Sequence, residues 1–310
     1  MRFLIVGAGG LGGYYGGMLV KGGADVAFLV RPRRQALLAA RGLVINSADG
    51  DFLSPVKTLR AGEINGPYDV VLLACKAYDL DGAIAAIAPA MGPQSAVLPV
   101  LNGINHIAVL EEHFGAGRVL GGVSYVRAEV TQAGEILHHS IAGFGRTLFG
   151  ELSGERSARS EEIRRAFAAG GVECTFSDDI LAEMWAKFCG YAVVAAMAVL
   201  TRARAGEIAA APAGAAFVAA VFEECARVTA AEGYRPPAAL SETIRGIYAT
   251  PGSIYAPSIL ADMESGGPTE GEHTIGDLVH RADRHALAVP ILRAALCTLQ
   301  ICEVRRTARG

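Results

Sequence analysis

The sequence lacks an excess of positive charge and lacks any paired cysteine motif. Its 28 Lys and Arg residues are outnumbered by 31 Asp and Glu residues, for a formal net charge of −3. Proteins that bind nucleic acid phosphates are normally basic, so we expect no nucleic acid partner. The six cysteines are scattered, with no C-x-x-C pair, and most lie in apolar stretches. We therefore expect buried free thiols in a reducing compartment, and no metal site.

Long apolar runs are also missing. The longest uncharged stretch, residues 82–110, contains three prolines and two asparagines, whereas a membrane helix needs about 20 mostly apolar residues. The uncharged stretch 188–201 is too short to span a membrane. The apolar start of the chain, residues 1–6, leads into glycines and not into a cleavage site of a signal peptide. We expect no membrane segment and no export signal, and hence a cytoplasmic protein.

Apolar residues nevertheless make up 52% of the 310 residues, which is enough for a large core, and the length suggests two domains. The first part of the chain alternates short apolar runs with helical segments, as in a parallel sheet covered on both faces. Two short runs at 135–139 and 147–149 predict an antiparallel addition at the sheet edge. The other expected strands are 2–6, 25–30, 69–74, 96–101, 119–126 and 172–176.

After residue 177 the pattern changes to alanine-rich helices and strand signals nearly vanish. We therefore predict an α/β Rossmann-type doubly wound domain over residues 1–178, followed by an all-α domain over residues 179–310. The expected helices of the second domain are 180–200, 215–232, 238–248, 270–285 and 290–305.

The strongest local motif is Gly7-Ala8-Gly9-Gly10-Leu11-Gly12, between an expected strand and an expected helix. This context makes a G-x-G-x-x-G pattern specific for a dinucleotide. Gly7 permits a tight turn, Gly9 lets the backbone approach a pyrophosphate, and Gly12 lets helix and strand pack closely. Such loops bind FAD and NAD(P) alike, and the alternative is a plain glycine turn.

The end of the second strand bears on the choice of cofactor. NAD sites usually place a carboxylate there, but this chain has Arg31, followed by Arg33 and Arg34. An arginine pairs with the 2′-phosphate that a carboxylate would repel, so NADP(H) is favoured over NAD. The alternative is a solvated basic loop for at least one of Arg33 and Arg34. Lys76 and Asn102 each follow an expected strand at its carboxyl end, where ligands of open α/β sheets bind, so we expect both to contact the cofactor. An asparagine at such a position can hydrogen-bond both cofactor and substrate, although either residue could be an ordinary loop residue.

These residues resemble the ketopantoate reductase (2-dehydropantoate 2-reductase) family, and the resemblance extends over essentially the whole chain. It implies an active site in the cleft between the two domains and NADPH-dependent reduction of a 2-oxo acid to a 2-hydroxy acid. In the parent enzyme this reaction converts ketopantoate to pantoate, in pantothenate biosynthesis. The matching residues are the glycine motif, Arg31, Cys75-Lys76-Ala77, Asn102-Gly103, Trp185-Ala186-Lys187-Phe188, Ser258, Asp262 and Glu270.

The resemblance also implies roles. Lys187 would be the general acid that protonates the carbonyl oxygen, and Glu270 would orient it. Asn102 and Ser258 would hold the substrate, while Asp262 would support them and Ala128 would line the cofactor. From the residues alone, the alternative for Lys187 is an ordinary exposed pair with Glu183 on the same helix.

One departure from the family concerns the substrate. The family's lysine helix usually carries asparagines four, eight and eighteen residues after the lysine, where this chain has Tyr191, Ala195 and Ala205. Tyr191 could supply a replacement hydroxyl for substrate binding. The change favours a different 2-oxo acid or ketone as an alternative substrate, and a non-catalytic NADP(H)-binding protein is a third hypothesis. The alanine-rich half could also form a homodimer interface, but the sequence does not decide between monomer and dimer.

Overall fold

The computed structural model describes residues 1–140 and 145–308, and its contacts divide the chain into two compact units. The first unit comprises residues 1–101 and 106–183, and the second comprises residues 102–105 and 184 onward. The boundary between the two units therefore lies inside helix α6 (Ile180–Thr201), after residue 183, a few residues beyond the boundary expected at 178. The segment 102–105 follows a strand of the first unit but packs with the second.

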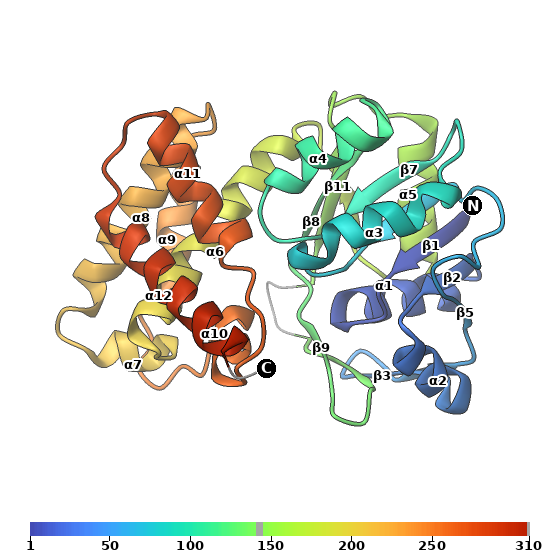
Figure 1. Cartoon of the computed structure of the whole chain (residues 1–310), viewed down its shortest axis with the longest axis horizontal. Helices are drawn as coiled ribbons and strands as arrows, with labels where there is room; N and C mark the ends of the chain where they lie inside the picture. The colour runs from blue at the N-terminus through green and yellow to red at the C-terminus, as the bar shows by residue number, and fades with distance from the viewer. Residues whose placement is uncertain (141–144, 309–310) are drawn as a thin grey trace. The chain divides into compact units, whose positions relative to one another are not determined.

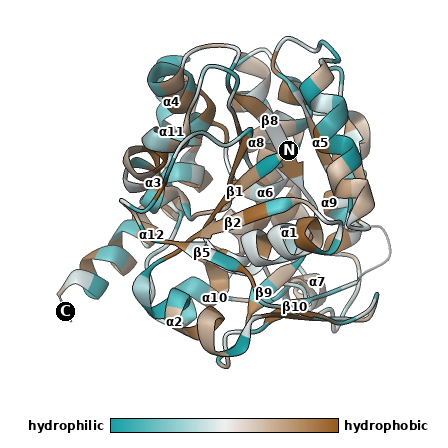
Figure 2. Cartoon of the chain, turned by 90° about the vertical axis from the view of Figure 1, so that its right-hand side faces the viewer, coloured by the Kyte–Doolittle hydropathy of each residue, from teal (hydrophilic) through white to brown (hydrophobic). Residues whose placement is uncertain are grey.

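The core of the first unit is a five-stranded parallel sheet, which confirms the predicted fold class. The strand order is β5-β2-β1-β6-β7, with β1 paired to β2 and β6. The strands β1, β2, β6 and β7 are almost wholly buried and mostly apolar, as expected for a sheet covered on both faces, whereas β5 at the edge is partly exposed. Figure 2 shows β1 and β2 mainly in brown. Their bounds are Arg2–Val6 (β1), Asp25–Leu29 (β2), Lys57–Leu59 (β5), Val70–Leu73 (β6) and Ala96–Pro99 (β7).

Helices connect the strands of this sheet (Figure 1). Helix α1 is almost wholly buried, whereas α2 buries only Leu38 and otherwise carries charged and small residues. Helix α2 was not predicted, because the arginines at its start were interpreted only as a possible basic loop after the second strand. The elements are α1 (Gly10–Lys21), α2 (Pro32–Arg41), η1 (Ala77–Asp79), α3 (Leu80–Ile87), η2 (Ala88–Ala90), α4 (Asn105–Phe114) and α5 (Ala158–Ala169).

Two smaller sheets complete the unit, in the orders β4-β3-β10-β9 and β12-β11-β8. The predicted antiparallel addition at the edge of the parallel sheet is wrong, because β10 and β11 lie in the two smaller sheets. Each strand does have an antiparallel neighbour: β11 runs antiparallel to β8, and β10 runs antiparallel to β9 and parallel to β3. The strands are β3 (Leu43–Ser47), β4 (Phe52–Ser54), β8 (Leu120–Ser124), β9 (Ala128–Val130), β10 (Ile136–His138), β11 (Thr147–Glu151) and β12 (Cys174–Phe176).

The described residues of the second unit form helices joined by loops and contain no strand. Helix α6 is long and apolar enough to cross a membrane by length and composition, but 72% of its most apolar window is buried inside the protein, as in a core helix. Helix α8 contacts α7, α9, α11 and α12 (Figure 1). The remaining elements are α7 (Ala205–Ala210), α8 (Gly214–Ala231), α9 (Ala238–Ile247), α10 (Ser258–Glu264), η3 (Glu272–Gly276), α11 (Asp277–Arg284) and α12 (Pro290–Thr307).

The single helix expected over 270–285 is interrupted. Residues 272–276 form a wide π-helical turn, η3, and α11 follows it, so Glu270 lies ahead of the helix. Such turns occur frequently at functional sites.

Candidate active site

The glycine motif forms a tight loop between β1 and α1. Gly7 has φ +90°, which only glycine adopts easily, and a Cβ on Gly12 would lie 2.0 Å from the Gly7 carbonyl oxygen. A Cβ on Gly10 would lie 2.1 Å from the carbonyl oxygen of Ala128 in β9. A Cβ on Gly9, in contrast, would meet nothing within 4 Å. The fold itself therefore requires glycine at positions 7, 10 and 12, whereas at Gly9 a side chain would project into open space.

The other two residues of the motif pack into the first unit. Ala8 is buried, and Leu11 packs against the hydrophobic core of the first unit. The first N–H groups of α1 have no partners earlier in the helix, and they lie at the positive end of its dipole. The loop therefore provides the anion-binding geometry expected for a dinucleotide phosphate.

The three arginines after β2 have different surroundings. Arg31 has an exposed side chain and donates from Nη2 to Asp79 Oδ1 at 2.7 Å. Arg33 is exposed. Arg34 is not part of a solvated basic loop, because it donates to the Gly134 carbonyl oxygen and burial lowers its pKa. The alternative of a solvated basic loop, expected for at least one of Arg33 and Arg34, therefore fits Arg33 but not Arg34. Arg31 keeps an exposed guanidinium held by a carboxylate.

Lys76 and Ala128 also lie in the first unit. Lys76 directly precedes η1 after the carboxyl end of β6, and its carbonyl accepts from the Asp79 N–H at 2.9 Å. This bond places Lys76 on the same turn as the carboxylate that holds Arg31. Ala128 pairs with His138 in the small sheet and packs its carbonyl on the start of α1.

Lys187 lies in the second unit, on α6. Its Nζ donates to Asn102 Oδ1 at 3.3 Å, across 85 residues of sequence. Burial lowers the pKa of Lys187 to about 8, and the charge of buried Glu270 opposes this shift. The alternative of an exposed pair with Glu183 is therefore not what the structure shows.

The segment that carries Asn102 is held close to η3. Gly103 has φ +89°, and a Cβ there would lie 2.9 Å from the carbonyl oxygen of His273. A larger residue would be strained in this backbone conformation and would push the two segments apart. Gly103 thus fixes the position of the Asn102 side chain near Lys187 and Glu270.

Tyr191 lies one helical turn after Lys187. Burial raises the pKa of Tyr191, the charges of Glu270 and Asp262 raise it further, and the Ser258 side chain lowers it. Ser258 and Asp262 lie one turn apart on α10. The second unit therefore brings together all six residues that were predicted for catalysis and substrate binding: Asn102, Lys187, Tyr191, Ser258, Asp262 and Glu270.

Ala195 and Ala205 are the other two positions at which the family usually has asparagine, and their side chains have no polar group. Ala195 is completely buried in the middle of α6, and Ala205 is 2% exposed at the start of α7. The Ala205 N–H donates to the carbonyl of Tyr255 at 2.9 Å. Tyr191 is therefore the only one of the three replacements with a side-chain hydrogen-bonding group.

An aromatic and charged cluster stabilises α6 just before Lys187. The rings of Trp185 and Tyr234 stack at 5.2 Å, and the guanidinium of Arg281 lies 4.8 Å from the Trp185 ring centre. Arg281 also pairs with Asp277 and Glu232, and all three side chains are largely buried. This cluster holds the backbone of α6 and contains none of the predicted site residues.

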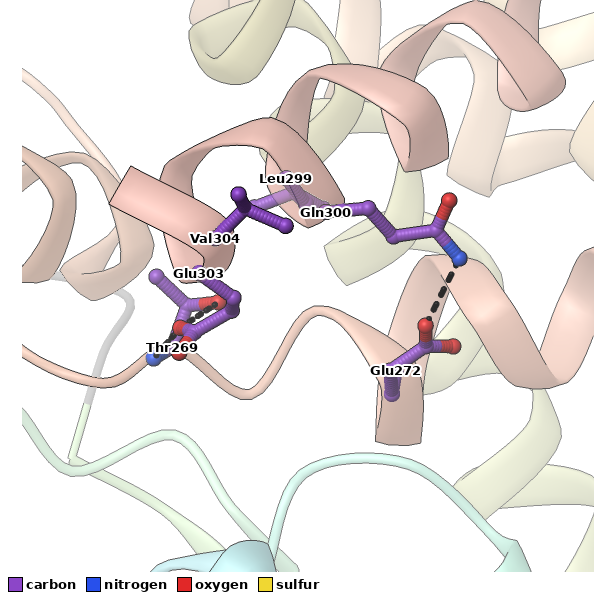
Figure 3. Close-up of a pocket in the computed structure, with 6 residues that line it drawn as sticks. All are labelled: Thr269, Glu272, Leu299, Gln300, Glu303 and Val304. Atoms are coloured by element: carbon purple, nitrogen blue, oxygen red, sulfur yellow. Dashed lines mark hydrogen bonds between the residues drawn. The ribbon is translucent and has the colours of Figure 1, made fainter. Parts of the chain in front are cut away.

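A separate hollow of about 280 Å³ lies between α12 and the segment that leads into η3 (Figure 3). Its carboxylates are already engaged: Glu303 accepts from the Thr269 N–H, and Glu272 accepts from Gln300, both at 2.9 Å. None of the predicted site residues lines this hollow. It is therefore not the candidate active site.

Sequence reasoning missed two residues near the predicted ones. Asp79 holds Arg31, but it is 48 residues away in sequence and no motif connects them. Tyr255 lies close enough to Tyr191 to raise its pKa. Both act through tertiary contacts, so a single sequence carries no signal for either.

Comparison with known proteins gives a consistent result over the whole chain. The family model described as ketopantoate reductase PanE/ApbA matches residues 3–154, and its C-terminal counterpart matches residues 179–302. The chain is 37% identical to the uncharacterised oxidoreductase YkpB of Bacillus subtilis, over 99% of this chain and 100% of that protein. It is 31% identical to the 2-dehydropantoate 2-reductase of Halobacterium salinarum, over 94% of this chain and 96% of that protein. It also resembles the crystal structure of 2-dehydropantoate 2-reductase from Geobacter metallireducens, with a TM-score of 0.87 and 30% identity, over 97% of this chain and 99% of that one.

Proposed function

The chain belongs to the ketopantoate reductase family of oxidoreductases, and from this premise we propose that it reduces a 2-oxo acid to the 2-hydroxy acid with NADPH. The reaction we propose first is that of 2-dehydropantoate to pantoate, in pantothenate biosynthesis. The observation that carries the proposal is the partly buried Lys187, with a pKa of about 8, hydrogen-bonded to Asn102 and next to Glu270.

The residues of the first unit fit a nicotinamide dinucleotide. The loop at Gly7–Gly12 places helix N–H groups at its tip, and the open space in front of Gly9 leaves the backbone accessible to a pyrophosphate. Arg31 supports NADPH over NADH, because its exposed guanidinium can pair with a 2′-phosphate. We propose that Lys76 and Ala128 also line this cofactor site.

The cofactor, when bound, supplies the hydride that is added to the carbonyl carbon. Lys187 would donate a proton to the carbonyl oxygen as negative charge develops there, and would then regain a proton from solvent. A lysine with a pKa of about 8 is a stronger acid than free lysine and is still mostly protonated at pH 7.

The neighbouring residues would keep this acid in place. Glu270 attracts the ammonium and so limits how far burial lowers its pKa. Asn102 accepts from Lys187 through its oxygen, which leaves its amide N–H groups for the substrate. Ser258 would contribute a hydroxyl to the substrate, and Asp262 would support it.

A different 2-oxo acid or ketone is a second candidate substrate, and the change at three positions favours it. Tyr191, Ala195 and Ala205 stand where the family usually has asparagines, so the polar contacts to substrate have changed while Lys187 and Glu270 are retained. Sites built on hydrogen bonds to substrate discriminate strongly, so such changes bear on substrate choice more than on reaction type.

A substrate panel tests the proposal. NADPH oxidation is followed with 2-dehydropantoate, with short and bulky 2-oxo acids and with simple ketones, and each is repeated with NADH. Faster turnover of 2-dehydropantoate than of every other compound would support the first substrate, and faster turnover of another 2-oxo acid would support the second. Tight NADPH binding without oxidation by any compound would refute the enzymatic proposal and favour a non-catalytic binding protein.

Two further expectations belong to this proposal. A homodimer is supported by large apolar side chains exposed on α12, where Ile301 is 45% and Val304 is 68% exposed. Light scattering on the purified protein measures the oligomeric state directly. None of the six cysteines, all of which lie in the described residues, forms a disulfide, and this supports a reducing, cytoplasmic location.

A further inference from the structure

The segment that carries Glu270 is held by helix α12. Glu303 on α12 accepts a hydrogen bond from the Thr269 N–H at 2.9 Å, and the Thr269 hydroxyl donates to the same oxygen at 3.3 Å (Figure 3). Leu299, one turn earlier on α12, is 2% exposed and packs on Gly271, where a Cβ would lie 2.7 Å from it. Residues four apart share one face of a helix. One face of α12 therefore contacts both chain neighbours of Glu270.

The position of the Glu270 carboxylate matters because of its effect on Lys187. Glu270 is 4% exposed, and its charge opposes the lowering of the Lys187 pKa by burial. The energy between two charges depends on their separation, and it is larger where water is excluded. A small displacement of the Glu270 backbone would therefore change both the orientation and the acidity of the ammonium.

Glu303 is a charged acceptor that does not itself act on Lys187. Among the described residues, the charge that shifts the pKa of Lys187 is that of Glu270. Burial raises the pKa of Glu303, but the hydrogen bonds from Arg306 and Thr269 outweigh it, and the net shift is downward. Glu303 therefore remains ionised near neutral pH, and an ionised acceptor forms the stronger hydrogen bond with a backbone N–H.

We propose that Glu303 is a positioning residue, which holds the backbone of Thr269 and so keeps the Glu270 carboxylate beside Lys187. The inference rests on the proposed function, in which Lys187 is the general acid. It gives α12 a part in the reaction, although none of the predicted site residues lies on this helix. Without the hydrogen bond to Thr269, the segment could move and Glu270 would attract the ammonium less strongly.

The test compares the wild type with Glu303→Ala, which removes the acceptor and keeps a good helix former. The readout is kcat/KM for the best 2-oxo acid of the panel, measured between pH 6 and 10. Because Glu270 would raise the pKa of Lys187 less, the alkaline limb should move to lower pH. At pH 7, kcat should fall about 2- to 10-fold, as for the loss of one hydrogen bond, with unchanged NADPH affinity. An alkaline limb that stays in place would overturn the proposal.

Two conservative variants separate the reach of the side chain from its charge. Glu303→Gln keeps an oxygen at the same distance without the charge, so its alkaline limb should lie close to that of the wild type. Glu303→Asp keeps the charge but is one methylene shorter, so it should behave like Glu303→Ala. A normal limb in Glu303→Asp together with a displaced limb in Glu303→Gln would show a direct effect of charge and overturn the proposal. This comparison also decides the matter if Glu303→Ala does not fold.

A matched variant on the same helix tests for general loosening. Gln300 donates from Nε2 to Glu272 Oε1 at 2.9 Å, so it also joins α12 to η3, but it contacts neither chain neighbour of Glu270 through this bond (Figure 3). Gln300→Ala should leave the alkaline limb in place. In a Glu270→Gln background, Glu303→Ala should move the limb no further, because the two residues act through one another. Equal displacement with and without the Glu270 carboxylate, or by Gln300→Ala, would overturn the proposal.

Failure of the inference can be told apart from failure of the proposed function. If the wild type reduces a 2-oxo acid and Glu303→Ala has the same pH profile, the inference alone is wrong. If the wild type reduces no 2-oxo acid, the proposed function is wrong, and the pKa of Lys187 is then measured by NMR on lysine-labelled protein, with the signal assigned from Lys187→Arg. A lower pKa in Glu303→Ala than in the wild type would support the positioning of Glu270, and an equal pKa would overturn it.

Discussion

The pKa of Lys187 leads to a specific prediction for the pH dependence of the reaction. The proposed general acid must be protonated to act, so activity should fall as the pH rises through its pKa. With a pKa of about 8, about nine-tenths of the lysines are protonated at pH 7 and about one-tenth at pH 9. An unperturbed lysine, with a pKa of about 10.4, would remain almost fully protonated over this range.

The assay is kcat/KM for the 2-oxo acid, measured by NADPH oxidation between pH 6 and 10. The profile should be flat near pH 7 and fall about tenfold per pH unit well above pH 8. Glu270→Gln tests the cause of the pKa. Because the charge of Glu270 raises the pKa of Lys187, its removal should move the alkaline limb to lower pH.

A matched variant separates this effect from general damage. Glu272 lies two residues later and hydrogen-bonds to Gln300, and it does not contribute to the pKa of Lys187. Glu272→Gln should therefore leave the alkaline limb in place. The reasoning would be refuted if activity stayed constant up to pH 10, or if Glu270→Gln and Glu272→Gln gave the same profile.

The other predictions concern the acid itself and the cofactor site. Lys187→Ala should lower kcat about 10²- to 10⁴-fold with little change in NADPH affinity, and equal activity would remove it from the mechanism. Gly9→Ala should weaken NADPH binding, measured by fluorescence titration, without changing the melting temperature, whereas Gly12→Ala should lower that temperature because its Cβ would clash with the backbone. If Gly9→Ala and Gly12→Ala had the same effects on NADPH affinity and melting temperature, Gly9 would not have the separate role in cofactor binding that we assign to it. Arg31→Ala should weaken NADPH much more than NADH, and similar losses would place the 2′-phosphate elsewhere. Asp79→Asn should tighten NADPH a few-fold and leave NADH unchanged, because its carboxylate competes with the phosphate for the arginine; unchanged NADPH affinity would show no competition.

The sequence was sufficient for the parts of the fold that have strong periodic signals. The strands β1, β2, β6 and β7 are continuous apolar runs, and the sheet they form is the predicted one. The strands β3 and β4 were not predicted, because β4 is only three residues long and β3 ends in polar residues. The strands β10 and β11 were both assigned to the edge of the parallel sheet and lie instead in two smaller sheets, because pairing between distant segments depends on tertiary packing.

For the candidate site, the sequence was sufficient to identify candidate residues but not the residues that contact them in the fold. The glycine loop and Arg31 were identified from their local context, since each follows a strand. The carboxylate that holds Arg31 comes from η1, 48 residues later, and nothing in the local sequence indicates it. The contact between Tyr191 and Ser258 could not be recognised either, because the two residues are 67 positions apart and meet only in the folded chain.

The acidity of Lys187 shows most clearly why local sequence is insufficient. On an isolated helix its only favourable neighbour is Glu183, and such a pair is worth a few tenths of a kcal/mol and would raise the pKa. In the structure the pKa of Lys187 is instead lowered, from 10.5 to about 8. This shift corresponds to a free-energy cost of roughly 3 kcal/mol for the charged form. Since Glu270 also raises this pKa, burial must outweigh the attraction of a neighbouring carboxylate. The property that would make this lysine an effective acid therefore comes from the packing of segments distant in sequence, including the one that carries Asn102.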